Sequence, residues 1–214
     1  MIVTTLVPEP DPNYTFTVEQ GIKVQQAHLN EWKKRVGEER AKQITTEAAG
    51  VGTAMHSNLE RFIAGLERMP GKNPVHVQAN QMADQIIING LNDVNEVWAM
   101  EQSLYFPGLY SGTTDLVAVY KDNPSVCDYK QTNKPKKAEW VDDYYMQLMA
   151  YILAHNEVYG TKIKRGVVFM CSRGDDTMAP GGEIYQQFDL FPKDFNKYQD
   201  MWLNKVEEYY NSLR

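Results

Sequence analysis

The chain has 214 residues, a length that fits one domain with a full hydrophobic core. Its apolar content of 43% and charged content of 23% are those of an ordinary globular protein, and no apolar run approaches the roughly 18 residues that a membrane-spanning helix needs. The net charge of −6 and the pI of about 5.3 argue against a general nucleic-acid binder, although local charge matters more than the total.

The N-terminus and the cysteines bear on where the protein works. Residues 1–14 contain no Lys or Arg, so they resemble neither a secretory signal nor an Arg-rich transit peptide. Cys127 and Cys171 each lie inside an apolar stretch. This placement predicts buried free thiols rather than a disulfide, and we expect a cytoplasmic protein that does not bind membranes.

The first ninety residues are expected to be mostly helical after an extended segment over about 1–17. Apolar residues at helical spacing predict three helices, over about 18–47, 54–68 and 75–90. The segment Gly50-Val51-Gly52-Thr53 breaks the first pattern, and Thr53 can cap the second helix. Pro70-Gly71 ends that helix.

The hydrophobic period changes after residue 90. β-branched and aromatic residues predict three consecutive strands, over about 97–106, 113–120 and 125–130. A helix follows over about 138–158, and Gly160 is its expected C′ residue. Two strands and a helix complete the chain, over about 165–172, 183–190 and from Pro192 onward. This order predicts an α/β fold, a central mixed β-sheet flanked by helices, with an N-terminal helical segment.

Charged residues interrupt two of the apolar strands. Asp115 directly precedes Leu116-Val117-Ala118-Val119, and Asp128 follows Val126-Cys127. Asp128 and Lys130 are two residues apart, so their side chains share one face of the strand. A lone Asp-x-Lys is most often a surface ion pair at a sheet edge. Unpaired carboxylates in apolar strands are costly, however, and a divalent cation held by both strands would remove that cost.

Two helical pairs accompany these strands. His56 and Glu60 are four residues apart, as are Gln147 and Tyr151, so each pair lies on one helix face. Taken alone, a helical histidine is most often simply hydrogen-bonded, and a Gln-x-x-x-Tyr pair is a weak signal.

In this order the segments resemble the RecB-like branch of the PD-(D/E)xK nuclease superfamily, which has a restriction-endonuclease-like core. That branch carries a helical His, a G-x-x-D strand, a D-x-K strand and a Q-x-x-x-Y helix. Here they read Gly52-Thr53-Ala54-Met55-His56, Gly112-Thr113-Thr114-Asp115, Asp128-Tyr129-Lys130 and Gln147-Leu148-Met149-Ala150-Tyr151. The phrases GTAMHSNLE, DYKQTNKPK and WKKRVGEERAKQI further resemble the mitochondrial genome maintenance exonucleases and their bacteriophage relatives.

The resemblance implies a metal site that uses Mg²⁺ or Mn²⁺. Asp115, Asp128 and the backbone carbonyl of Tyr129 would be ligands, and His56 would complete the shell. Lys130 would orient the attacking water and offset the charge that grows on the phosphate.

The resemblance implies supporting roles for other residues. Gln147 and Tyr151 would hold either the DNA strand or the active-site lysine. Glu101 lies where related nucleases often carry a carboxylate and would support the shell or bind a second metal; the alternative is a surface acid at a strand end. Glu60 would support the histidine motif. Two cysteines are too few for the four-cysteine iron–sulfur cluster of some related nucleases.

Two basic segments, 130–137 and 161–173, are expected to lie together beside this site and to contact DNA. The residues expected to do so are Lys134, Lys136, Lys137 and Arg173. The alternative for both segments is a solvated charged face. Nearby aromatic residues would either stack on bases or pack in the core, and they are Trp140, Tyr144 and Tyr145.

The predicted protein is thus one nuclease domain over 1–214, with a helical lead-in over 1–50 and a catalytic core over 51–214. We expect a metal-dependent exonuclease that hydrolyses DNA from its ends and prefers single strands. It would act in replication, recombination or repair, in bacterial or phage-infected cytoplasm. The alternatives are a double-strand-specific recombination exonuclease, a structure-specific endonuclease, and a DNA-binding module without catalytic activity.

Overall fold

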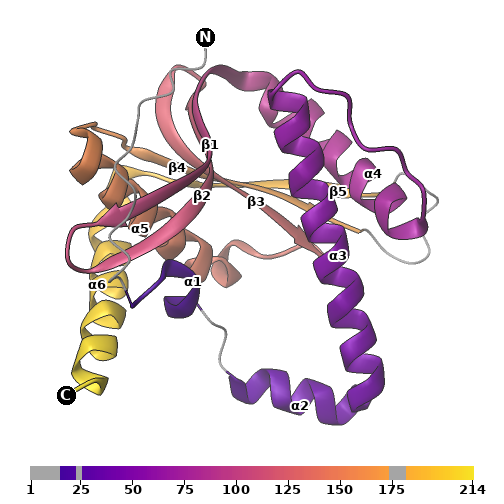
Figure 1. The fold of residues 1–214 in the computed structure, drawn as a ribbon, viewed down its shortest axis with the longest axis horizontal. Coiled ribbons are helices and arrows are strands. Elements are labelled where there is room, and N and C mark those ends of the chain that lie inside the picture. The colour runs from indigo at the N-terminus through magenta and orange to yellow at the C-terminus, as the bar shows by residue number, and fades with distance from the viewer. Residues whose placement is uncertain (1–14, 23–25, 174–181) are drawn as a thin grey trace.

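The computed structural model describes residues 15–22, 26–173 and 182–214, so nearly all of the expected extended segment over 1–17 lies outside it. A five-stranded sheet of order β1-β2-β3-β4-β5 lies at the centre, with helices on both sides (Figure 1). The strands are β1 (Val94–Phe106), β2 (Tyr110–Tyr120), β3 (Asn123–Thr132), β4 (Arg165–Ser172) and β5 (Ile184–Leu190). This confirms the expected α/β architecture.

The sheet is mixed because one of its connections is a helical crossover. β3 and β4 run parallel, and α5 joins them, whereas all other neighbouring strands are antiparallel. A two-residue turn at Lys121 and Asp122, whose φ values are +47° and +62°, joins β2 to β3. Both residues have the positive φ that tight hairpin turns require. Asn123 and Pro124, which precede the strand expected over 125–130, are already part of β3.

Six α-helices are described: α1 (Val18–Gly21), α2 (Gln26–Val36), α3 (Glu38–Ile63), α4 (Pro74–Asn89), α5 (Asp142–Tyr159) and α6 (Phe195–Ser212). Three short 3₁₀ helices lie between other elements, and they are η1 (Leu91–Asp93), η2 (Ala138–Trp140) and η3 (Pro192–Asp194). α3 and α4 cover one face of the sheet, and α5 and α6 cover the other. No described helix is long and apolar enough to cross a membrane.

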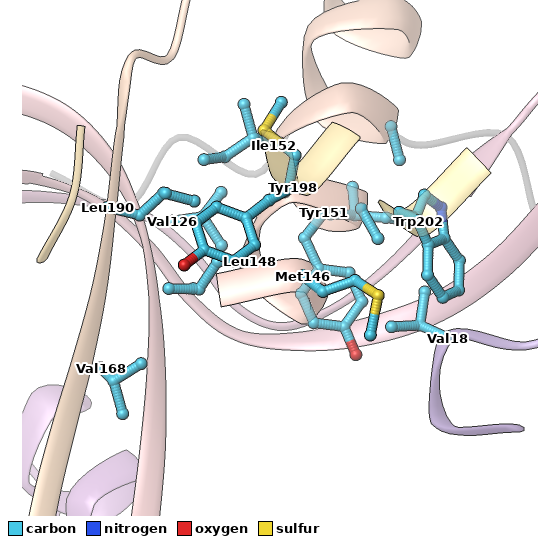
Figure 2. Close-up of a cluster of buried hydrophobic side chains, with 14 of the residues drawn as sticks. Val18, Val126, Met146, Leu148, Tyr151, Ile152, Val168, Leu190, Tyr198 and Trp202 are labelled. Carbon is cyan, nitrogen blue, oxygen red and sulfur yellow. The ribbon is translucent and has the colours of Figure 1, made fainter. Parts of the chain in front are cut away.

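Alternation along the strands divides the interior into two cores. Val126 and Val168 face α5 and α6, where they pack with Leu148 and Trp202 (Figure 2). The next residue along each strand faces the opposite core, under α3 and α4. That core holds Cys127 and Cys171, both fully buried and free, as expected.

The expected helix break at Gly50-Val51-Gly52-Thr53 is wrong. α3 runs unbroken through it, so Thr53 lies inside a helix and caps nothing. Instead the chain breaks at Gly37, between α2 and α3, where φ is +85°. Glycine reaches this region without the steric penalty that a side chain brings. Within α3, a Cβ at Gly50 would meet Val75 of α4 at 3.4 Å, an ordinary van der Waals contact, so the helix needs no glycine there.

Candidate active site

The sheet opens between β2 and β3 at the site that the motifs predict. The two strands pair from Tyr120↔Asn123 to Leu116↔Cys127. Beyond Cys127, β3 keeps pairing with β4, while the first half of β2 keeps pairing with β1. Asp115 lies where the strands part, and its Oδ2 accepts the backbone N–H of Tyr129 at 2.6 Å. A carboxylate therefore takes the place of a backbone acceptor at this opening.

Three other elements bring polar groups to Asp115. His56 of α3 places Nδ1 3.5 Å from Asp115 Oδ1 and Nε2 3.0 Å from the carbonyl oxygen of Tyr129. One potential ligand atom from each of His56, Glu101 and Asp115 lies within 4.8 Å of the other two. An imidazole nitrogen and two carboxylate oxygens at this spacing fit Mg²⁺ or Mn²⁺, with the Tyr129 carbonyl beside them.

Glu101 reaches this group from a strained stretch of β1. Its φ is +45°, in the left-handed region that costs a non-glycine residue about 1–2 kcal/mol. The flanking pairs Met100↔Leu116 and Gln102↔Thr114 place Glu101 across from Asp115. Burial raises the pKa of the Glu101 carboxyl, and the charges of Asp115 and Glu60 raise it further. A cation at this position would relieve that repulsion.

His56 and Asp115 each stabilise the charged form of the other. Burial lowers the pKa of the His56 imidazole, but the hydrogen bond and charge of Asp115 outweigh it, so the pKa is raised overall. Burial raises the pKa of Asp115, but the hydrogen bond and charge of His56 and the charge of Lys130 bring it below its usual range. Asp115 is thus a carboxylate at neutral pH.

Asp128 and Lys130 form an ion pair beside the group of three. Asp128 is only 2% exposed, and burial raises its pKa to about 6 although Lys130 lies next to it. Burial lowers the pKa of Lys130, but the charges of Asp128 and Asp115 raise it above the usual range. The shared strand face predicted for both side chains therefore holds a charged pair. In the structure Asp128 contacts Lys130 and is outside the group formed by His56, Glu101 and Asp115.

A pocket of about 540 Å³ lies beside the three candidate metal ligands, His56, Glu101 and Asp115, and is open to solvent. Its lining comes from α3 and β1, and consists of Gly52, Thr53, His56, Ser57, Glu60 and Glu101. Glu60, expected to support the histidine motif, is thus part of the wall. The potential ligand atoms of His56 and Glu101 are accessible to a cation and to a substrate.

The Gln-x-x-x-Tyr pair leads to a residue that the sequence did not single out. Gln147 Nε2 donates to the Tyr151 hydroxyl at 3.3 Å, and that hydroxyl donates to Glu19 Oε1 at 3.1 Å. Gly112 makes this packing possible, since a Cβ there would lie 2.9 Å from the Tyr151 ring. Nothing local to α1 marks Glu19, because only tertiary packing brings it to Tyr151.

The expectation that both basic segments lie beside the site is wrong for the first part of the second segment, which carries Lys162, Lys164 and Arg165. β3 and β4 are parallel, with Ser125↔Arg165 and Lys130↔Met170, so the start of β4 lies five residues from Lys130 along the sheet. At about 3.3 Å per residue that is roughly 16 Å. Arg165 is also committed, since its guanidinium pairs with Asp189 at 2.6 Å.

Of the four residues expected to contact DNA, Arg173 is already paired. Its guanidinium lies 2.9 Å from the Glu47 carboxylate of α3, which reduces its availability to a phosphate. Lys134, Lys136 and Lys137 follow β3 directly, on the side of Lys130. Lys134 and Lys137 are exposed and Lys136 is half-buried.

Comparison with known proteins supports a nuclease. No family model matches the chain. Mitochondrial genome maintenance exonuclease 1 of Xenopus tropicalis is 26% identical over 209 residues, which are 92% of this chain. The human protein of that name is 26% identical over 207 residues. The chain is a homologue of these exonucleases. This confirms the resemblance drawn from the motifs and is consistent with a PD-(D/E)xK nuclease relationship.

This exonuclease homologue spans 57–58% of the length of the two relatives. Among solved structures, an exonuclease candidate from Eubacterium rectale matches with a TM-score of 0.51 and 11% identity, covering 78% of this chain and 68% of its own. That likeness concerns the fold alone and agrees with a restriction-endonuclease-like core.

Proposed function

We propose that the chain is a divalent-metal-dependent DNA exonuclease that prefers single strands. The observation that carries the proposal is the convergence of His56, Glu101 and Asp115 within 4.8 Å, beside the buried Asp128–Lys130 pair. Homology to exonucleases supports the same reaction.

We assign the ligand role to Asp115, His56 and Glu101, with Asp128 and the Tyr129 carbonyl completing the shell. A bound Mg²⁺ or Mn²⁺ supplies an activated water and neutralises charge on the phosphate. The protein contributes rigidity: Asp115 is tied to the Tyr129 N–H, and His56 to the Tyr129 carbonyl. Ligands fixed by backbone in this way do not have to rearrange during the reaction.

Lys130 supplies the positive charge that the chemistry needs. Its ammonium is mostly buried and stays protonated, because Asp128 and Asp115 face it. A fixed charge in a partly dry site stabilises the developing phosphorane charge more than a solvated one would. Asp128, besides its proposed role as a ligand, holds the ammonium in position through their ion pair.

The preference for single strands rests on the limited extent of basic surface. The net charge of −6 repels a duplex over most of the molecule. The exposed lysines next to the site belong to one short segment, 134–137, which suits a narrow strand. Action from an end follows from the same restriction, because a strand reaching the opening of the sheet must approach along this segment.

The test compares linear single-stranded DNA with a covalently closed circle of the same sequence on a denaturing gel over one time course. We expect the linear strand to shorten progressively and the circle to persist. An equal rate of cutting of the circle would replace the exonuclease by an endonuclease. Cutting of blunt duplex DNA as fast as single strands would instead favour a double-strand-specific enzyme.

A further inference from the structure

Trp140 is an unusually exposed aromatic residue close to the proposed site. It lies in η2, between β3 and α5, and is 56% exposed, whereas Trp202 of the core is fully buried. An exposed indole has no packing role on its outer face. Tryptophan on a surface is common where a flat aromatic ligand binds.

A lysine accompanies the indole. Lys137 Nζ lies 5.2 Å from the centroid of the Trp140 ring, and the backbone N–H of Trp140 donates to the Lys137 carbonyl at 2.9 Å. Their pairing is fixed by this single turn of 3₁₀ helix. The nearest acid, Glu139, lies 3.8 Å from Lys137 and both side chains are 68% exposed, so this ion pair is weak. A cation beside an aromatic face matches the alternation of phosphate and base along a single strand.

The segment that carries these residues is fastened to the sheet. Gln186 of β5 accepts the Lys136 N–H at 2.7 Å and donates to the Lys136 carbonyl at 2.8 Å. Gln186 pairs with Met170, which pairs with Lys130, so the three residues lie in one row across the sheet. This row positions Lys136 on the same side as Lys130.

Tyr144 connects the segment to Lys130. The ammonium groups of Lys130 and Lys136 each lie 5.6 Å from the centroid of the Tyr144 ring, so they are at most twice that distance apart. That span corresponds to at most about three nucleotides at the ~3.4 Å rise of a duplex strand, and to fewer in an extended single strand.

We infer that Trp140 stacks on one unpaired base a few nucleotides from the phosphate at Lys130, while Lys136 and Lys137 bind the phosphates between them. This inference rests on the proposed function. It names single-stranded DNA as the occupant, because a base inside a duplex is already stacked on its neighbours and cannot cover the indole. Trp140 is thereby a specificity residue, and its contact with the base contributes to binding rather than to the chemical step.

The experiment moves a single abasic site along a labelled single-stranded oligonucleotide. Binding is measured by fluorescence anisotropy with Mg²⁺ in a Lys130→Ala background, where the strand stays intact. We expect one abasic position near the end to weaken binding about 5- to 100-fold, and Trp140→Ala to abolish that dependence. Trp140→Phe, which keeps an aromatic face, should retain a reduced dependence.

Phe191→Ala is the matched control. Phe191 is 42% exposed and lies 5.5 Å from the Arg165 guanidinium, so it is also an exposed aromatic beside a cation, but next to the far end of β4. Its abasic profile should equal that of the parent. A Trp140→Ala profile that keeps the dependence, or a Phe191→Ala profile that loses it, would overturn the inference. Failure of the wild type to cleave single-stranded DNA in Mg²⁺ or Mn²⁺ would instead overturn the proposed function, and the binding profile would not be affected by it.

Discussion

Lys130 has its ammonium surrounded by acidic groups and mostly removed from water. Side chains in such a setting act through their charge more than through contact area. We therefore assign Lys130 a role in the transition state, whereas Lys134, Lys136 and Lys137 bind the strand in the ground state as well. The two roles separate kinetically, since an interaction made only in the transition state changes turnover and not affinity.

Lys130→Ala should therefore abolish turnover and leave the affinity for single-stranded DNA within a few-fold of the wild type. Initial rates and fluorescence anisotropy on one preparation measure both quantities. Lys121→Ala is the control, because Lys121 also pairs with an acid, Asp93 at 3.1 Å, but in the turn between β2 and β3. Near-normal turnover with weak binding in Lys130→Ala would reduce this lysine to a phosphate contact.

At the scale of single residues, the signal that predicted the site was a charged residue inside an apolar strand. Asp115, Asp128 and Lys130 were identified in this way, and the structure brings all three to one opening of the sheet. Glu19 and Gln186 could not be identified, because each contributes through a long-range contact that no local pattern encodes.

Among the elements, the loop between β3 and η2 is the one whose charge bears most on DNA binding. Reversing Lys134, Lys136 and Lys137 to Glu should weaken binding and flatten its salt dependence, by about 0.7 in slope for each single-strand phosphate that the variant no longer binds. Anisotropy titrations over a series of salt concentrations give this slope.

Lys162→Glu with Lys164→Glu is the matched variant, since both lysines are exposed but precede β4 at the far end of the sheet. Its slope should equal that of the wild type. If the variant at 134, 136 and 137 also has the slope of the wild type, these lysines do not contact DNA and form a solvated charged face, as in the alternative interpretation.

The C-terminal end of α5 carries a histidine that links stability to pH. His155 is 5% exposed, lies 2.8 Å from the Thr161 hydroxyl and stacks near Trp98. Burial lowers its pKa to about 4. In the unfolded chain the same histidine binds a proton near pH 6.5. Above pH 6.5 it is neutral in both states and folding loses nothing, whereas between 6.5 and 4 only the unfolded chain takes up the proton, so the free energy of unfolding falls.

His155→Gln should therefore show a smaller loss of unfolding free energy between pH 7 and pH 4 than the wild type. The difference should be roughly 2–3 kcal/mol, at about 1.4 kcal/mol per unit of pKa. Urea unfolding at both pH values measures it. Parallel losses in the two proteins would mean that His155 titrates normally in the fold.

The hydrophobic period predicted whether a segment forms a helix or a strand, but not the residues at which the element begins and ends. The strands, α5 with its C-terminal Gly160 in the left-handed region, and α6 are where the patterns predicted them. The break inside the N-terminal helices was misplaced by thirteen or more residues, because the glycines at 50 and 52 look like a turn signal but lie inside the unbroken helix α3. Sequence spacing cannot distinguish a glycine that ends a helix from one that a helix tolerates.

Across the whole molecule, the core under α3 and α4 holds α3 against β1, β2 and β3. The proposed ligands come from these four elements, so the site depends on the sheet and not on a single loop. We propose one nuclease domain over 1–214, in which α3 runs without a break across the expected boundary at residue 50, and Glu19 of the N-terminal part accepts a hydrogen bond from Tyr151 of the catalytic core.

The proposed site also accounts for how a chain with a net charge of −6 would act on DNA. In the proposed site the acidic groups are concentrated where a divalent cation would offset most of their charge, and the neighbouring lysines would accept the strand. Without the cation, the same carboxylates would repel the phosphate.

The most direct test of the proposed function is the metal dependence of cleavage. Purified protein is incubated with end-labelled linear single-stranded DNA in Mg²⁺ or Mn²⁺, then after thorough chelation with EDTA, then after the metal is restored. We predict that cleavage stops on chelation and returns with the metal, and that Asp115→Asn stays inactive throughout. Undiminished cleavage by the wild type in excess EDTA would contradict the proposed function, because no other group in the described site activates water at neutral pH.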